Sequence, residues 1–165
     1  MTVNAKTALA ALRDSDHPFG RPLALCLLFE PAKDQCLAAS IFDLAIALDS
    51  ALHIPSESLL AAIRVQWWVD ALSESGAQKA PLVAQLQAQF QTHDGLQSEI
   101  IDLIGYWQTA CHDEYRDNSD GRAAVWALVA KHMGQVAQSA IATDIGHQLH
   151  HVIRGHEPHA AVPLD

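Results

Sequence analysis

Histidine is the most prominent residue type in this chain that could do chemistry. The 165 residues include ten histidines, and the last twenty positions hold His147, His150, His151, His156 and His159. His147 and His151 are spaced i, i+4 and share one helix face, a spacing that can hold a transition metal. The segment has no cysteine partner and no His-Glu-x-x-His pattern, which favours solvated or capping histidines. A metal-binding tail therefore stays an alternative.

The segment IRVQWWVDAL is the second candidate, because it combines a cation, an amide and two adjacent indoles. Ile63, Trp67 and Ala71 recur at i, i+4 and i+8, which predicts that Trp67 lies in the core. Trp68 follows Arg64 by one helical turn, so the guanidinium can lie against its ring. That contact could be structural or could line a pocket.

The cysteines give weaker signals. Cys111, His112 and Asp113 are consecutive, but neighbouring helical residues point about 100° apart and cannot form a relay. Cys26, Cys36 and Cys111 are odd in number and lack a Cys-x-x-Cys spacing. Neither a disulfide framework nor a structural zinc site is indicated, and we expect buried thiols.

Helical periodicity runs through most of the chain. Alanine and leucine dominate the apolar positions and β-branched runs are short, which favours helices over strands. The longest stripe predicts one continuous buried face, formed by Leu37, Ile41, Leu44, Leu48 and Leu52. Breaks at Pro, Gly and Asp-Asn-Ser signals predict helices over Thr2–Arg13, Arg21–Phe29, Lys33–His53, Ser56–Ser75, from Pro81 onward, Gln97–Tyr115, Gly121–Met133 and Gln135–Arg154.

Two local signals set the expected arrangement around the tryptophans. Ser56 is a suitable N-cap for the helix that follows Pro55. The short turn at Pro55 predicts that the flanking helices pack as antiparallel neighbours around Trp67.

Composition indicates one all-α domain over residues 1–165, a helical bundle with an irregular tail at 155–165. Half of the residues are hydrophobic and 18% are charged, enough for a substantial core. The formal charge of −9 argues against nucleic acid and anionic membranes as partners. Asp43 and Asp49 interrupt the most apolar window, so we expect no transmembrane segment, and without a signal peptide we expect a cytoplasmic protein.

Two segments resemble the squalene/phytoene synthase family. LLFEPAKDQCLAASIFDLAIALDSALHIPSESLLAAIRVQWW, residues Leu27–Trp68, aligns without a gap over the family pattern "ALFLPA…ALYAF…SEP.LGEIRLQWW". DLIGYWQTACHDEYRDNSDGRAAVWALVAKHMG, residues Asp102–Gly134, resembles the "LIDGWE…RG…LA..LG" pattern of shortened bacterial members. The resemblance implies an isoprenoid synthase fold and enzymes that join two prenyl diphosphates head to head with magnesium.

The family's first DxxxD motif falls on Asp49 and His53, so one carboxylate remains and histidine replaces the other. Magnesium prefers oxygen ligands, whereas an imidazole suits zinc, nickel or cobalt better. The resemblance makes Asp49 and His53 candidate metal ligands, and we expect weakened magnesium affinity.

The C-terminal segment Ile145–Asp165 resembles the family's second motif, "QLTNILRDVGED…YLP.D", and Gln148 and Arg154 match it. Its two metal-binding aspartates fall on Gly155 and His159, so both are lost. The resemblance implies that Asp49, His53, Arg64, Gln148 and Arg154 line one ligand-binding cleft. Arg64 or Arg154 could hold a phosphate or pair with an internal carboxylate such as Asp49 or Asp70.

These losses favour a non-catalytic relative that binds a protein partner, a second copy or an isoprenoid or other lipid. Removing even one electrostatic donor commonly costs ~10² to 10³ in rate, and three of the four expected carboxylates are absent. The chain also stops before the helices that complete the hydrocarbon tunnel of the synthases. A respiratory complex I assembly factor that resembles these enzymes is a precedent for such a departure. An active prenyl transferase that uses Mg²⁺ remains the alternative.

Overall fold

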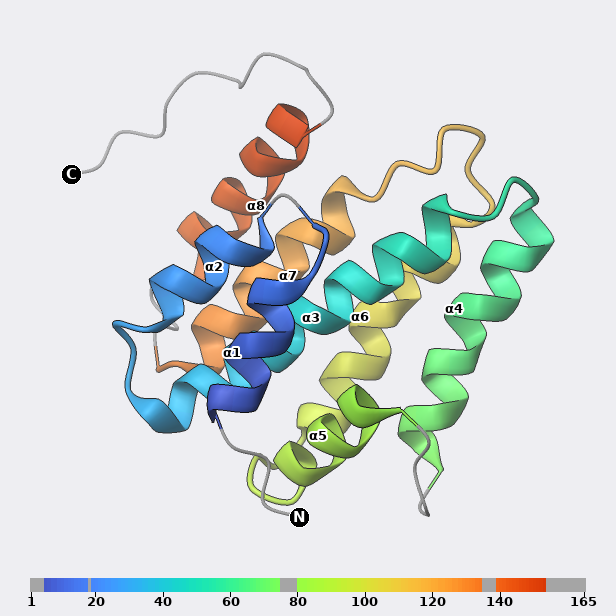
Figure 1. Cartoon of the computed structure of the whole chain (residues 1–165). Coiled ribbons are helices and arrows are strands. Elements are labelled where there is room, and N and C mark those ends of the chain that lie inside the picture. The colour runs from blue at the N-terminus through green and yellow to red at the C-terminus, as the bar shows by residue number, and fades with distance from the viewer. Residues whose placement is uncertain (1–4, 18, 75–79, 135–138, 154–165) are drawn as a thin grey trace.

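The computed structural model describes residues 5–17, 19–74, 80–134 and 139–153, and the secondary structure within these ranges is entirely α-helical (Figure 1). This confirms the predicted all-α class. The helices are α1 (Ala5–Asp14), α2 (Gly20–Leu27), α3 (Ala32–His53), α4 (Ser58–Ser73), α5 (Pro81–Phe90), α6 (Leu96–Ala110), α7 (Ser119–His132) and α8 (Ser139–Ile153).

Helix α3 is the centre of the bundle and crosses the middle of the molecule in Figure 1. It packs against α1, α2, α4, α5, α6 and α7. The predicted stripe is confirmed, since Leu37, Ile41, Leu44, Leu48 and Leu52 are all buried. Residues 34–53 are long and apolar enough to cross a bilayer by length and composition, but 67% of the most apolar window is buried among the other helices. The hydrophobicity of α3 therefore reflects its burial at the centre of the bundle.

Local signals place several helix ends correctly. Helix α5 begins at Pro81, where the missing N–H of proline costs no helical hydrogen bond. Gly95 precedes α6 with a φ of 80°, a left-handed conformation that glycine adopts without strain. The predicted N-cap at Ser56 is wrong, because α4 begins at Ser58 and Glu57 occupies the N-cap position without a side-chain capping bond.

The prediction that Trp67 lies in the core is also wrong. Trp67 is 45% exposed and Ile63 is 56% exposed, and Ala71 is the one member of the predicted stripe that is buried. The other buried side chains of α4 are Ala61, Val65 and Leu72. Helix α4 is apolar on most of its circumference, so periodicity alone offers two possible buried stripes. The packing of α4 against α3 and α6 selects the stripe of smaller residues.

The exposed side of α4 forms an apolar surface that we call the α4 face, consisting of Leu59, Leu60, Ile63 and Trp67. Trp68 is half-buried and packs against the core, with its ring centroid 4.9 Å from that of Trp67. Arg64, Trp67 and Trp68 line one groove between α3 and α4. The predicted stacking of Arg64 on Trp68 remains a prediction.

The segment after α6 joins the bundle through an arginine. Helix α6 ends before the predicted boundary at Tyr115, and Arg116 adopts a φ of 49°. Its guanidinium donates to the backbone carbonyls of Leu52, at 2.7 Å, of Pro55, and of Ser56, at 3.0 Å. A cation is favourable there because the last carbonyls of α3 lack helical partners. Arg116 therefore ties the α6–α7 connection to the turn between α3 and α4.

Helices α7 and α8 pack closely together, and Gly146 permits the approach. A Cβ at this position would lie 2.5 Å from Cα of Ala123 and 2.9 Å from Cδ1 of Trp126. Any larger residue would push α8 away from α7. The spacing of these two helices bears directly on the site described next, because both helices contribute to its walls.

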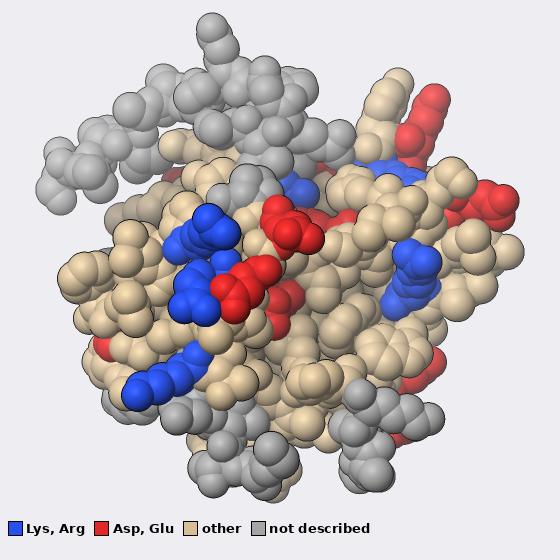
Figure 2. All heavy atoms as spheres, viewed as in Figure 1, with Lys and Arg blue, Asp and Glu red and all other residues tan. Residues whose placement is uncertain are grey.

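The charged side chains are mixed rather than segregated on the face shown in Figure 2. Lys and Arg residues gather over α1 and α2, where Lys6, Arg13 and Arg21 lie around a groove that also includes Asp14. Arg13 and Asp14 form an exposed ion pair at 2.8 Å. This face therefore carries no uninterrupted basic patch of the kind that binds nucleic acid.

Candidate functional site

The candidate site is an apolar cavity of about 240 Å³ between α2, α3, α7 and α8. It is also bordered by the segment that joins α1 to α2. Its apolar walls include Phe19, Pro22, Leu23, Phe42, Ala45, Ile46, Val125, Trp126 and Leu149. The ionisable side chains among its lining residues are His17, Cys26, Asp49 and Arg122. The cavity thus combines an apolar wall with a small polar end.

The polar end is built on Asp49. Its Oδ2 lies 3.0 Å from Nη2 of Arg122, and its Oδ1 accepts a 3.0 Å hydrogen bond from Nε1 of Trp107. The side chains of Arg122 and Asp49 are only 14% and 12% exposed, and Trp107 is fully buried. Both carboxylate oxygens therefore have fixed partners, supplied by α6 and α7.

The start of α7 positions Arg122. Its backbone N–H donates to the carbonyl of Asn118, and the buried Asn118 side chain lies over Gly121. A Cβ at Gly121 would collide with that side chain, so a larger residue there would displace Asn118. Nε and Nη1 of Arg122 are buried without a hydrogen-bond partner. Unpaired buried donors of this kind are uncommon in proteins.

His17 is the other ionisable group close to this pair. Its Nδ1 accepts a 3.3 Å hydrogen bond from the backbone N–H of Phe19. Burial lowers the pKa of His17, and Arg122 acts in the same direction while Asp49 opposes it. The imidazole is therefore neutral at neutral pH, because its reference pKa already lies near 6.5.

The residues that we expected in one cleft are separated. Asp49 lines the cavity, but Arg64 lines the different groove between α3 and α4. His53 is exposed at the end of α3, and Gln148 is half-buried on α8, beside residues that line the cavity. Arg154 lies outside the described residues. Among the described residues, the ion-pair partner of Asp49 is Arg122, which the sequence did not single out.

The donors around Asp49 do not fit the magnesium ion that the family resemblance implies. A dication would have to share the Asp49 carboxylate with the Trp107 indole and would lie beside the Arg122 guanidinium, which repels it. His147 lies 3.8 Å from Asp120. The side chains of His150, His151, His156 and His159 lie outside the described part of the chain. Within the described residues, no group of three His, Cys, Asp or Glu side chains is arranged to hold a metal.

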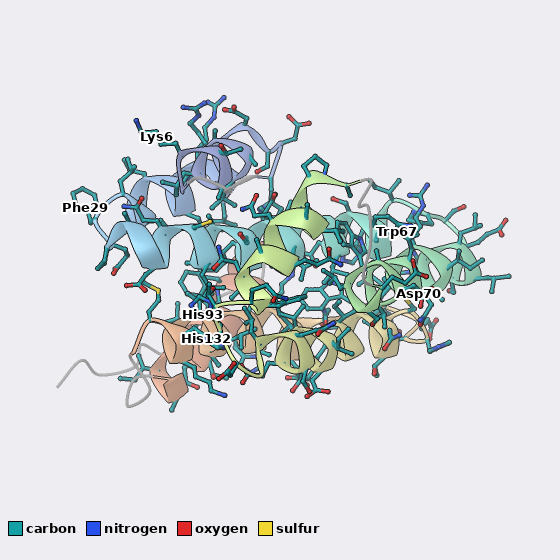
Figure 3. The ribbon with its side chains drawn as sticks, turned by 90° about the horizontal axis from the view of Figure 1, so that it is seen from below. Lys6, Phe29, Trp67, Asp70, His93 and His132 are labelled. Carbon is teal, nitrogen blue, oxygen red and sulfur yellow. The ribbon has the colours of Figure 1, made fainter. Side chains whose placement is uncertain are left out.

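A second histidine cluster joins the α5–α6 turn to α6 and α7. Glu99 accepts hydrogen bonds from Lys131 at 2.9 Å and pairs with His132 at 2.7 Å. The rings of His93 and His132 meet edge to face, with centroids 5.8 Å apart. Figure 3 labels these two residues next to each other. None of the residues of this cluster lines the cavity, and they link helix ends, so we interpret the cluster as structural.

Sequence reasoning missed three residues of the site. Arg122 lies in the expected helix Gly121–Met133, and Trp107 lies in a segment quoted only for its resemblance. His17 lies in a loop. No local spacing relates any of them to Asp49. The expectation of buried thiols was also wrong for Cys26, which is exposed and lies at the cavity wall, although Cys36 and Cys111 are buried.

Comparison with protein-family models, curated proteins and solved structures gives no match for this chain. The relation to squalene/phytoene synthases therefore stays an expectation based on the sequence segments quoted above. Any functional proposal has to start from the geometry of the cavity and the exposed surfaces.

Proposed function

We propose that this chain is a non-catalytic relative of the squalene/phytoene synthases that binds one isoprenoid or other lipid-like molecule. The observation that carries this proposal is the apolar cavity with the Asp49–Arg122 pair at its polar end. Ligand sites are usually concave, mostly apolar and furnished with a few polar groups that orient the ligand. The cavity has this composition.

The size of the cavity supports a single small ligand. Its volume of about 240 Å³ lies just below the roughly 300–1,000 Å³ of typical ligand pockets. Coupling two prenyl diphosphates requires space for two hydrocarbon chains and for a metal that neutralises the leaving group. Asp49, the carboxylate left from the family motif, is occupied by Trp107 and Arg122. Binding without turnover accounts for both features.

Binding is tested best by filling the cavity from α3. Ala45 lines the cavity, whereas Ala47 lines the groove on another side of the same helix. We expect isothermal titration calorimetry to detect binding of geraniol or farnesol to the unaltered protein. Ala45→Leu should abolish the binding heat, and Ala47→Leu should leave it unchanged because it places the same side chain outside the cavity. Equal binding by both variants would remove the cavity from consideration.

Turnover is tested separately with farnesyl or geranylgeranyl diphosphate, magnesium and a reductant. We expect no coupled product, because the metal-binding carboxylates of the family are replaced or engaged. Detection of squalene or phytoene that disappears in Asp49→Asn would establish the alternative, an active prenyl transferase.

The α4 face supports a second candidate function, association of two copies of the chain. Its four apolar side chains are between 45% and 70% exposed. Arg64 and Asp70 lie on either side of Trp67 along the exposed part of α4. An antiparallel pair of α4 helices that cross at Trp67 would bring each Arg64 towards the Asp70 of the other copy, a self-complementary arrangement typical of twofold dimers.

Sedimentation velocity tests this candidate. We expect a concentration-dependent dimer that Ile63→Glu abolishes, because a carboxylate would be buried in the centre of the interface. Leu25→Glu is the matched control, since Leu25 is equally exposed on α2. A monomer at all concentrations would exclude self-association and leave the α4 face for another partner.

A further inference from the structure

The charges at the polar end of the cavity balance one another. Asp49 and Arg122 form one ion pair at 3.0 Å, and both side chains are mostly buried. His17 is neutral at neutral pH because burial lowers its pKa. Cys26 is the remaining ionisable residue of the lining, and it lies on α2 at an exposed position. The cavity therefore presents no net charge to a ligand.

This balance determines which head group the cavity can accept. An ionised group that leaves water loses its hydration, and only an opposite charge with additional hydrogen bonds compensates for that loss. The positive charge of Arg122 is already compensated by Asp49. A phosphate or carboxylate placed in the cavity would be the uncompensated charge of the site. A diphosphate, with several charges, would be the least favourable head group.

We infer that the cavity selects an uncharged apolar ligand, such as an ester or a hydrocarbon, and rejects the anionic form of the same molecule. This inference rests on the proposed ligand-binding function and specifies its ligand class. It departs from the prenyl diphosphates that the family resemblance implies. The selection follows from Arg122, which converts the ancestral metal position at Asp49 into a closed ion pair.

Three probes with one hydrocarbon tail test this selection by titration calorimetry: methyl geranate, geranate and the parent hydrocarbon 2,6-dimethyl-2,6-octadiene. At about pH 8 geranate is ionised, so the ester and the acid differ mainly in charge. We expect the ester to bind at least about tenfold more tightly than geranate, because an uncompensated charge is costly to bury. The hydrocarbon is the second uncharged probe and should also bind more tightly than geranate.

A charge change at Asp49 should reverse the preference. Asp49→Asn keeps an oxygen that can accept the Trp107 indole N–H but leaves Arg122 as an uncompensated cation. Geranate should then bind more tightly than methyl geranate. The double variant Asp49→Asn/Arg122→Gln removes both charges and should restore the preference for the ester. If the single variant does not fold, the comparison of ester and acid on the unaltered protein decides the question.

The outcomes separate this inference from the proposed function. Tighter binding of the ester, lost in Ala45→Leu but not in Ala47→Leu, supports the inference. Equal or tighter binding of geranate by the unaltered protein overturns the neutral-ligand selection while the ligand-binding function stands. Binding of the ester that survives Ala45→Leu places it outside the cavity and also overturns the inference. If none of the three probes binds, the proposed function itself fails.

Discussion

The cavity beside Asp49 and the α4 face are both apolar, but the charged side chains of the two regions differ in burial. In the cavity, Asp49 and Arg122 are buried and paired within the protein. Along α4, the charged side chains of Arg64 and Asp70 remain at the surface beside exposed apolar groups. Figure 3 shows Trp67 and Asp70 together on this exposed side. The charged groups of the cavity are thus fixed by contacts within the protein, whereas those along α4 lie at the molecular surface.

The largest loss of stability is expected from truncating Trp107, in contrast to the partly exposed Trp67. Trp107 is fully buried and its indole donates to Asp49. We expect Trp107→Ala to lower the free energy of unfolding by roughly 3–5 kcal/mol, as for other buried aromatic truncations. Urea denaturation followed by far-UV circular dichroism measures this loss. A loss below about 1 kcal/mol would contradict the full burial of Trp107 in the core.

The next largest effect on stability is expected for the buried ion pair between Asp49 and Arg122. Asp49→Leu or Arg122→Met alone leaves one buried charge without its partner, which typically costs about 3–5 kcal/mol. The double variant removes both charges, and we expect it to recover most of the lost unfolding free energy. A double-mutant cycle from urea titrations measures this coupling. Additive losses in the double variant would show that the two charges do not depend on each other.

A smaller effect should appear in the pH dependence of stability. The pKa of His17 is lowered in the folded protein, so the unfolded chain binds the proton more readily. The stabilisation by neutral His17 is present above the unfolded pKa near 6.5 and is lost as pH falls towards the lower folded pKa. We expect His17→Gln to flatten the decline of melting temperature below about pH 6.5. His112→Gln, at an exposed imidazole, is the control and should not flatten it.

The smallest stability change is expected on α4. Trp67→Ala removes a side chain that is 45% exposed, so we expect a loss of unfolding free energy below about 1 kcal/mol. If α4 mediates dimerisation, the same variant should weaken the dimer in sedimentation velocity even though the fold is retained. A loss comparable to that of Trp107→Ala would mean that Trp67 belongs to the core, as its helical spacing first suggested.

Helix positions could be predicted from the sequence because their causes are local. The stripe from Leu37 to Leu52 repeats at helical spacing. Pro81 restricts the backbone at the start of α5, and Gly95 permits the left-handed conformation that precedes α6. These signals need no knowledge of the rest of the chain. Local signals did not identify the buried face of α4, because this helix carries apolar residues on several sides.

The sequence by itself determined an all-helical chain and its central apolar helix. It also drew attention to Asp49, which the family resemblance makes a candidate metal ligand. Only the tertiary structure decided that Asp49 meets Trp107 and Arg122, because these residues come from helices far along the chain and share no spacing with it. Burial then changes their chemistry, since a carboxylate paired with a guanidinium in an apolar enclosure cannot act as an open metal ligand. The tertiary structure also decided which side of α4 is exposed, because the helices that pack against α4 leave Trp67 partly uncovered.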